Sequence, residues 1–494
     1  MTIWRRSAGA LTAILLYAAV ASAQVWQPLN NPASFSAGAM LLLTDGTVLV
    51  HSEQSNSSLW FKLTPDANGS YVNGTWKQIA SMPAGYAPLY FASAVLPDGR
   101  MIVEGGEYNN LSAVWTNQGA IYDPLTNAWT SVAPPSGWRT IGDAQSAILP
   151  NGTFMLANCC TKETALLDPT TLTWTPTGAG KFDVNDEEGW NLLPNGKVLT
   201  VDAYVFQYDK SGMNSEIYDP ALGTWTSAGS TIVQLWDSAA GCGGTNKASF
   251  EVGPAVLRPD GTVFATGANA CGGAHTAIYN SLSGTWTAGP DFPGRYNVAD
   301  GPAALEPSGH VIVMASPNVF VPPHAKFFEW DGSSLTEIPG PLNAAHDASF
   351  YGHFLELPTG QLLFTDFSSD IEVFTPSGTY NQSWAPTISK APPTVVRGHT
   401  YTVSGTQFNG LSEGAAYGDD FQGATNFPLV RLVNNATGHV SYCRTHDHST
   451  MAVATGDTTV STQFDVPANA ETGASQLFVV ANGIASPLWS LKVN

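Results

Sequence analysis

One short motif returns seven times along this chain and constrains its fold more than any other feature. Each copy is a tripeptide ending in glycine, set between two short apolar runs, at intervals of roughly fifty residues. Asp-Gly and Asn-Gly pairs supply the positive φ angles that a tight hairpin needs, so each copy predicts two buried strands joined by a short turn. The tripeptides are Thr44-Asp45-Gly46, Pro97-Asp98-Gly99, Pro150-Asn151-Gly152, Pro194-Asn195-Gly196, Pro259-Asp260-Gly261, Pro307-Ser308-Gly309 and Pro358-Thr359-Gly360.

A bulky apolar residue on a further short strand follows each turn after about twenty to thirty residues. A third strand that ends in a turn precedes it, as in Ile121-Tyr122-Asp123-Pro124, so each unit carries four strands. A lone four-stranded sheet cannot bury both of its faces, whereas seven sheets packed radially can. We therefore predict an all-β chain with a seven-bladed β-propeller. The marker residues are Trp76, Trp129, Trp174, Trp225, Trp286, Leu335 and Trp384.

With these repeats the chain resembles the kelch-repeat proteins, and within them the galactose oxidase-like group, over residues 24–494. The double glycine of the kelch repeat survives clearly only at Gly105-Gly106. The resemblance implies a kelch-type propeller followed by a small β-sandwich. Two closures of the ring stay open: Trp26 completes the seventh blade from the N-terminus, or Trp384 completes it from the C-terminal side.

The last hundred or so residues lose this rhythm after Ala385-Pro386. Short alternating stretches such as Thr400-Tyr401-Thr402-Val403 follow, and they predict an immunoglobulin-like sandwich. Phe464-Asp465-Val466-Pro467 and Leu477-Phe478-Val479-Val480 resemble the C-terminal domain of galactose oxidase-like enzymes. We expect a propeller over residues 24–384 and an immunoglobulin-like domain over residues 385–494.

The N-terminus predicts export. Arg5 and Arg6 precede a short apolar run, and Ala21-Ser22-Ala23 is a small-x-small cleavage site, so residues 1–23 are typical of a signal peptide. The mature chain is expected to be secreted or periplasmic and to contain no membrane span. A net charge of −20 disfavours nucleic acid and anionic membranes as partners.

The five cysteines are too few for a disulfide scaffold. In an oxidising compartment Cys242 and Cys271 are candidates for a disulfide between two loops of one blade. Cys159 and Cys160 are adjacent, and they form either a vicinal disulfide or two thiols. The count is odd, so at least one thiol stays free or pairs with another chain, and we favour Cys443.

Two histidines in the C-terminal domain are candidate metal ligands. His446 and His448 alternate along Cys443-Arg444-Thr445-His446-Asp447-His448-Ser449, so in an extended strand both point to one side and can chelate a metal. The resemblance implies more, because a Thr-His of this domain reaches along the propeller axis and ligates copper in the galactose oxidase family. His446 is the matching position. The other interpretation is that both histidines only tie the two domains together.

The position seven residues before each turn lies early on the innermost strand, near the central channel. Asp143, Glu187 and Asp300 occupy it in three units, and Tyr90 and Tyr351 occupy it in two. Carboxylates in one ring repel each other, which favours a bound cation. Together with His446 and His448 they predict a mixed histidine and carboxylate site for copper or another divalent metal. A wet, polar channel without a metal is the alternative.

The radical-copper chemistry of the resembling family requires a Cys cross-linked to a Tyr and an adjacent Tyr-His pair. By register these positions hold Tyr90, Asp143 and Phe350-Tyr351, so none of the three elements is retained. Alcohol oxidation by that mechanism is therefore not expected.

Two hypotheses follow for function. The first, which we favour, is a binding module for a carbohydrate or an extracellular protein, because the loop aromatics Tyr108, Trp115 and Trp236 can stack on sugar rings. The second is a metal-dependent, oxidoreductase-like enzyme with a non-standard site at the channel mouth.

Overall fold

The computed structural model describes residues 24–53, 57–205, 212–238, 248–320, 323–421 and 423–494. The expected signal peptide lies outside these residues. The described part consists of strands with short 3-10 helices η2 (Ala344–His346), η3 (Ser349–Tyr351) and η4 (Gln382–Trp384). The prediction of an all-β chain is confirmed. No helix in these ranges is both long and apolar enough to cross a membrane.

Besides one small three-stranded sheet, seven antiparallel sheets follow one another in the described ranges before residue 376. Each is numbered here in chain order and runs from an innermost to an outermost strand. The first three are β2 (Ala37–Leu42), β3 (Val48–Ser52), β4 (Trp60–Thr64) and β5 (Thr75–Gln78); β7 (Ala92–Val95), β8 (Met101–Glu104), β11 (Gly119–Asp123) and β12 (Ala128–Val132); and β13 (Ser146–Ile148), β14 (Phe154–Ala157), β15 (Thr164–Asp168) and β16 (Thr173–Thr177).

The fourth and fifth sheets are β17 (Trp190–Leu192), β18 (Val198–Val201), β19 (Asn214–Asp219) and β20 (Thr224–Ser230); and β21 (Ala255–Leu257), β22 (Thr262–Thr266), β23 (Thr276–Asn280) and β24 (Thr285–Ala288). The sixth and seventh are β25 (Ala303–Leu305), β26 (Val311–Ala315), β27 (Lys326–Trp330) and β28 (Leu335–Ile338); and β29 (His353–Glu356), β30 (Leu362–Thr365), β31 (Glu372–Thr375) and β1 (Val25–Pro28). A small sheet of β6 (Pro88–Leu89), β9 (Tyr108–Asn109) and β10 (Ser112–Ala113) lies beside the second.

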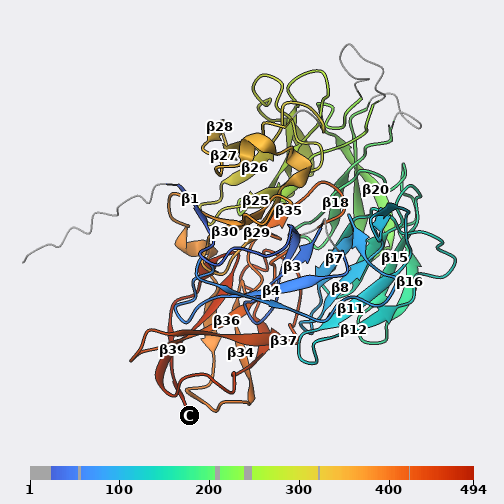
Figure 1. Ribbon diagram of the computed structural model, residues 1–494. Coiled ribbons are helices and arrows are strands. Elements are labelled where there is room, and N and C mark those ends of the chain that lie inside the picture. Colours follow the sequence, from blue (N-terminus) through green and yellow to red (C-terminus); the bar gives the residue numbers. More distant parts are fainter. Residues whose placement is uncertain (1–23, 54–56, 206–211, 239–247, 321–322, 422) are drawn as a thin grey trace, which may run out of the picture.

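The predicted turns shape every sheet. All seven tripeptide glycines have φ between 75° and 85°, a region that side-chain-bearing residues rarely adopt. Each inner strand contacts the inner strands of its neighbours, and β29 contacts β2, so the sheets close into a ring (Figure 1). The fold is therefore a β-propeller. We call the end of the ring where the inner strands begin the mouth, and the opposite end, with the tripeptides, the turn end.

Tryptophans on the outermost strands hold neighbouring sheets together. The Trp129 indole N–H donates to the carbonyl oxygen of Ala80 at 2.8 Å, and the Trp174 indole donates to that of Ala133 at 2.7 Å. In both cases the acceptor follows the preceding sheet. The ring closes through β1, whose Trp26 pairs with Phe374 of β31, while Trp384 lies in η4 after the last sheet. The first of the two expected closures is the one observed.

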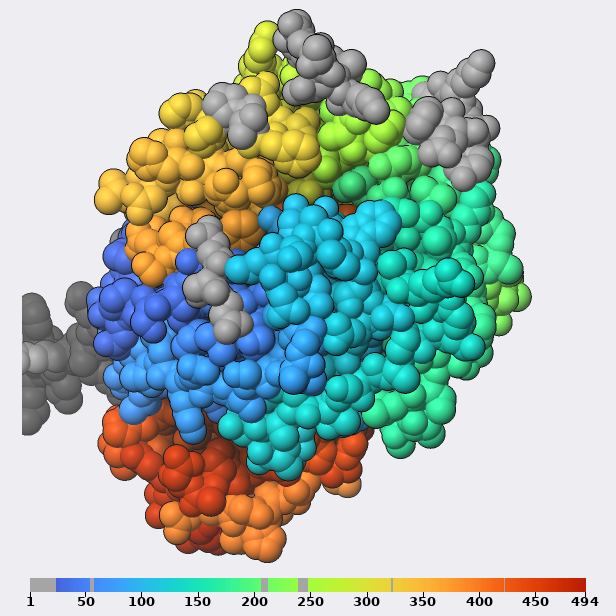
Figure 2. Space-filling view, turned by 45° about the vertical axis from the view of Figure 1, so that its right-hand side comes forward, coloured from blue at the N-terminus to red at the C-terminus, as the bar shows by residue number. Residues whose placement is uncertain are grey.

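The C-terminal residues form a sheet that lies below the ring in Figures 1 and 2. Its strand order is β32, β34, β38, β37, β36, β39, β41 and β33, and β40 pairs with β39. The strands are β32 (Thr387–Lys390), β33 (Thr394–Val395), β34 (Thr400–Thr406), β36 (Leu429–Asn434), β37 (Val440–His446), β38 (Val460–Asp465), β39 (Gly473–Ala481), β40 (Ile484–Ala485) and β41 (Trp489–Val493). A buried cluster around Val403, Phe464 and Leu477 forms its core.

One segment of this C-terminal part enters the ring. Residues 409–421 and 423–427, which we call the axial segment, contain β35 (Ala415–Ala416), and β35 pairs with the inner strand β25 of the sixth sheet. The same strand also contacts β21 and β29, so the axial segment runs along the inside of the ring (Figure 1). The mouth is thus built from both parts of the chain.

Candidate functional site

Six carboxylates converge at the mouth. Asp143, Glu187, Glu251 and Asp300 stand just before the inner strands of four successive sheets, and Asp419 and Asp420 come from the axial segment. They form two groups, in each of which one oxygen per residue lies within 4.8 Å of the others. The groups are Asp143, Asp419 and Asp420, and Glu187, Glu251 and Asp300.

Glycines allow the axial segment to come this close to the mouth. A side chain at Gly418 would meet Oδ1 of Asp300 at 2.4 Å, and one at Gly189 would meet the carbonyl oxygen of Gly418 at the same distance. The Tyr417 hydroxyl donates to the carbonyl oxygen of Phe350 at 2.9 Å. These contacts fix Asp419 and Asp420 beside the carboxylates of the ring.

Burial and mutual repulsion raise the pKa values of these carboxyls. Burial raises the pKa of Asp143 well above its ordinary value, and the charges of Asp420 and Glu187 raise it further. The pKa of Glu251 rises for the same reasons, through burial and then through Asp300. Burial raises the pKa of Asp300 to about 7. A bound cation removes both costs, because it replaces lost water and offsets the repulsion.

Several carboxylate oxygens at the mouth have no protein partner. Oδ1 of Asp143, Oε2 of Glu251 and Oδ1 of Asp300 are buried and accept no hydrogen bond within the described part of the chain. The Glu251 residue as a whole is only 6% exposed. A buried acceptor without a donor costs about 1–3 kcal/mol, so these atoms indicate a ligand that supplies positive charge.

The backbone is strained at the same register position in three sheets. Tyr90, Glu187 and Asp300 have φ angles of 51°, 56° and 41°, in the left-handed region that non-glycine residues seldom occupy. Such conformations cost of order 1–3 kcal/mol each and cluster at functional sites. Here they direct three side chains of the mouth.

The two predicted histidines are not part of this cluster. The backbone N–H of Asp447, between them, donates to the carbonyl oxygen of Pro97 at 3.0 Å, so they lie at the turn end. Both ring nitrogens of His446 contact carboxylates, Asp447 at 3.0 Å and Asp465 at 3.2 Å, and Nδ1 of His448 contacts the hydroxyl of Thr462 at 2.9 Å. The structure therefore does not bring His446 and His448 together with Asp143, Glu187 and Asp300, and the prediction of one site made of all five residues is wrong. The axial segment brings Asp419 and Asp420 to the mouth instead.

Aromatic side chains surround the carboxylates. Tyr90 packs against Tyr108 with ring centroids 6.0 Å apart, and Tyr351 packs against Phe367 at 5.3 Å. Trp115 is 42% exposed and lies beside the backbone of Gly142, next to Asp143. Aromatic rings therefore lie beside the buried carboxylates of the mouth, and Trp115 is exposed to solvent there.

Trp236 does not belong to this rim. It is buried, its indole N–H donates to the carbonyl oxygen of Gly212 at 3.0 Å, and its ring stacks on Phe250 with centroids 5.4 Å apart. The expectation of an exposed Trp236 is wrong, because the residues just before β19 cover one edge of the ring and Phe250 covers its face.

The side chains of the consecutive residues Asp186, Glu187 and Glu188 lie in three different environments. Glu187 faces the mouth, whereas Asp186 lies 3.8 Å from the sulfur of Cys159. Glu188 is buried and pairs with the ammonium of Lys181 at 3.0 Å. That ammonium also contacts Asp183 at 2.8 Å and Glu216 at 2.7 Å, so it anchors a buried ion network behind the mouth.

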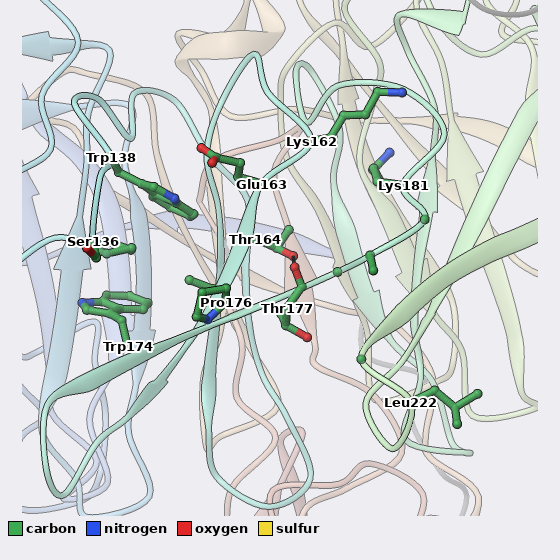
Figure 3. A pocket seen from close by; sticks show the side chains of 16 residues that line it. Ser136, Trp138, Lys162, Glu163, Thr164, Trp174, Pro176, Thr177, Lys181 and Leu222 are labelled. Carbon is green, nitrogen blue, oxygen red and sulfur yellow. Dashed lines mark hydrogen bonds between the residues drawn. The ribbon is translucent and has the colours of Figure 1, made fainter.

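A separate groove of about 680 Å³ opens between the third and fourth sheets (Figure 3). Trp138 and Trp174 lie at one end of it, and Lys162 and Glu163 lie at the edge of the third sheet. None of the carboxylates at the mouth lines this groove.

The cysteines divide into two kinds. Cys271 is disulfide-bonded, and its expected partner Cys242 lies outside the described residues. Cys159, Cys160 and Cys443 are free. Cys443 is fully buried in the C-terminal sheet.

The fold and the site define a β-propeller with a carboxylate-rich mouth. No protein-family model matches the chain. Over 130 residues the chain is 27% identical to the Kelch-like protein terF of Aspergillus terreus, a match that spans 25% of this chain and about a quarter (26%) of the relative.

Two solved structures are similar at low identity. A fungal alcohol oxidase of the AA5 family in complex with copper is 15% identical, with a TM-score of 0.49, over 96% of this chain and 99% of that one. Virginiamycin B lyase from Staphylococcus aureus is 9% identical, with a TM-score of 0.48, over 72% of this chain and all of that one (100%).

Sequence reasoning missed the two aspartates that complete the cluster. Asp419 and Asp420 lie in Ala415-Ala416-Tyr417-Gly418-Asp419-Asp420, within a glycine-rich stretch without the alternation of a sandwich strand. That break in the pattern, together with two adjacent acids, is the signal that marks a segment leaving the domain.

Proposed function

We propose that this is a secreted protein of the kelch, galactose oxidase-like type that binds a carbohydrate through a divalent cation at the mouth. The proposal includes a seven-bladed propeller over residues 24–384 and an immunoglobulin-like domain over residues 385–494. The observation that carries it is the convergence of six carboxylates, three of which keep a buried oxygen without a partner.

The donor set favours a hard cation. Every ligand atom in the two groups at the mouth is a carboxylate oxygen, and carboxylates suit calcium, magnesium or manganese. Copper prefers imidazole or sulfur ligands, and His446 and His448 lie at the other end of the ring. These residues therefore do not fit the copper centre that the resemblance implies. Calcium is the better choice, since it takes six to eight oxygen ligands in flexible geometry.

The rim supports a carbohydrate as the bound partner. Sugar hydroxyls complete the coordination of a hard cation, and the apolar face of a sugar ring packs on an aromatic side chain. Trp115 is exposed beside Asp143, and Tyr108 packs on Tyr90. The net charge of −20 favours a neutral saccharide over an acidic one.

Metal analysis and calorimetry test the proposal. Purified mature protein is expected to retain stoichiometric calcium, and a panel of neutral oligosaccharides should contain one that binds with calcium and not with a chelator. A protein without calcium that takes up copper stoichiometrically overturns the assignment of the cation. Calcium-independent binding of the saccharide overturns its role as the bridge.

A second candidate is a metal-dependent enzyme at the same place, favoured by the strained backbone at Tyr90, Glu187 and Asp300. Mass spectrometry of a bound oligosaccharide after long incubation with the calcium-loaded protein decides between the two. New products support the enzyme, and an unchanged saccharide supports the binding module.

A further inference from the structure

Two adjacent cysteines lie directly behind the mouth. Cys159 and Cys160 occupy the loop between β14 and β15, and their sulfur atoms are 2.7 Å apart. Cys160 has a φ of 64°, a left-handed conformation that is uncommon for a residue with a side chain. Cys159 is buried, whereas Cys160 is partly exposed.

The loop is tied to two of the segments that carry the carboxylates. The N–H of Cys159 donates to the carbonyl oxygen of Ile141 at 3.0 Å, two residues before Asp143. The N–H of Cys160 donates to the carbonyl oxygen of Asn185 at 2.7 Å, two residues before Glu187. A change in the geometry of the pair therefore reaches both carboxylates through the backbone.

Neither sulfur has another cysteine to pair with in the described part of the chain. Cys271 is already disulfide-bonded, and Cys443 is buried in the C-terminal sheet. A zinc ion does not fit the distance between the two sulfur atoms. Two thiolates on one tetrahedral zinc lie about 3.7 Å apart, given zinc–sulfur bonds of about 2.3 Å. The observed separation of 2.7 Å instead favours direct reaction between the two sulfurs.

We propose that Cys159 and Cys160 form a redox-active pair that closes a vicinal disulfide and thereby fixes the segments carrying Asp143 and Glu187. The second half rests on the proposed cation site, whereas the first half stands without it. The oxidant is a small disulfide such as oxidised glutathione, and the more exposed Cys160 is the sulfur that it reaches first.

The reaction balances in two exchanges. The sulfur of Cys160 loses its proton and attacks oxidised glutathione, which forms a mixed disulfide and releases one glutathione thiol. The sulfur of Cys159 then loses its proton and attacks the sulfur of Cys160, which releases the second glutathione. In total the pair gives up two hydrogens, and one glutathione disulfide is reduced to two thiols.

Peptide mass spectrometry after alkylation tests the first half. Folded protein treated with oxidised glutathione, then denatured and alkylated, should yield a Cys159–Cys160 peptide that lacks two hydrogens and carries no alkyl group. The C159S variant should stop at a glutathione adduct on Cys160, and C443S should behave like the parent. Two alkyl groups on the parent peptide, or two glutathione adducts, overturn the proposal.

Calcium titration of the two redox forms tests the second half. We expect several-fold tighter binding in the oxidised form, and no response to oxidant in the C159S/C160S double variant. Equal affinities in both forms overturn the coupling to the mouth. Absence of calcium binding in both forms contradicts the cation site and its coupling, while the peptide masses still decide whether the disulfide forms.

Discussion

Trp26, on the first strand, pairs with Phe374, on the last strand of the ring, and their ring centroids lie 4.7 Å apart. The Trp26 ring also packs against Phe327 of the sixth sheet at 5.0 Å, and its indole N–H donates to the carbonyl oxygen of Pro339 at 2.7 Å. One residue near the N-terminus therefore joins two sheets that are formed more than three hundred residues later in the chain.

Replacing Trp26 by alanine should destabilise the closed ring. We expect a loss of about 3 kcal/mol, because a large aromatic ring leaves a cavity among phenylalanines. Chemical denaturation of parent and variant measures it. Leu282→Ala is the control, since Leu282 is 97% exposed, and an equal effect of both substitutions contradicts this role for Trp26.

Replacing Asp420 by asparagine should weaken calcium binding at least about tenfold, which corresponds to roughly 1.4 kcal/mol. The amide keeps the size of the side chain but removes a charged ligand from its group with Asp143 and Asp419. Titration calorimetry measures the affinity. Asp291→Asn is the matched control, because Asp291 is exposed and pairs with His275 far along the chain from the axial segment. Unchanged calcium affinity in D420N excludes Asp420 as a ligand.

Stability should depend on pH with a sign set by Asp300. Its pKa is raised from 3.8 in the unfolded chain to about 7 in the folded protein, so the folded state holds the proton more tightly. In a chelator, stability is therefore highest near pH 4 and falls as the pH rises toward 7, by at most about 1.4 kcal/mol per pH unit for each proton. Melting temperatures across this range measure it.

Calcium and the variant Asp300→Asn give the two checks on that slope. Calcium binds the ionised carboxylates, so a saturating concentration should flatten or reverse the fall. The asparagine variant should show a shallower slope in the chelator, because the group no longer titrates. If neither calcium nor the Asp300→Asn substitution changes the slope, groups other than Asp300 cause the pH dependence of stability.

Replacing Lys181 by methionine should cost about 3–5 kcal/mol, because it leaves buried Asp183, Glu188 and Glu216 without their ammonium. Urea unfolding measures the change. Lys326→Met is the control, since the pair of Lys326 with Glu337 is exposed and such pairs contribute about 0–1 kcal/mol. Equal changes in the two variants would show that the buried acids take up protons at little cost.

Saccharide binding should respond to Trp115 and not to Trp174. Trp115 is exposed at the mouth, and Trp115→Ala should reduce affinity by about tenfold, in line with the loss of a stacking contact of about 1–2 kcal/mol. Trp174 lines the separate groove in Figure 3, so Trp174→Ala should leave affinity unchanged. If Trp174→Ala reduces the affinity and Trp115→Ala does not, the saccharide binds in the groove and not at the mouth.

The sequence predicts those parts of the molecule that depend on local rules. A tripeptide such as Pro97-Asp98-Gly99 needs a left-handed glycine wherever it makes a hairpin, and φ at Gly99 is 84°. Asp143, Glu187 and Asp300 each precede the tripeptide of their unit by seven residues. This equal spacing predicts that all three lie at the same end of the ring, just before an inner strand. The structure places Glu187 and Asp300 in one group with Glu251, and Asp143 in the other group with Asp419 and Asp420.

The parts that escaped prediction depend on contacts far apart in the chain. The path of the axial segment is set by its pairing with β25 and by the close approach of Gly418 to Asp300, and neither contact has a local signature. The resemblance to the galactose oxidase family implies instead that His446 reaches along the propeller axis. The hydrogen bond between Thr445 and Thr44 instead holds the histidine strand at the turn end.

The origin of Asp419 and Asp420 in the axial segment has a consequence for biosynthesis. Translation delivers Asp143, Glu187, Glu251 and Asp300 long before these two aspartates. The group of Glu187, Glu251 and Asp300 is complete once residue 300 has been made, whereas the group of Asp143, Asp419 and Asp420 is complete only after residue 420. In the cation site that we propose, a product terminated before residue 419 therefore lacks two of the three ligands of this group.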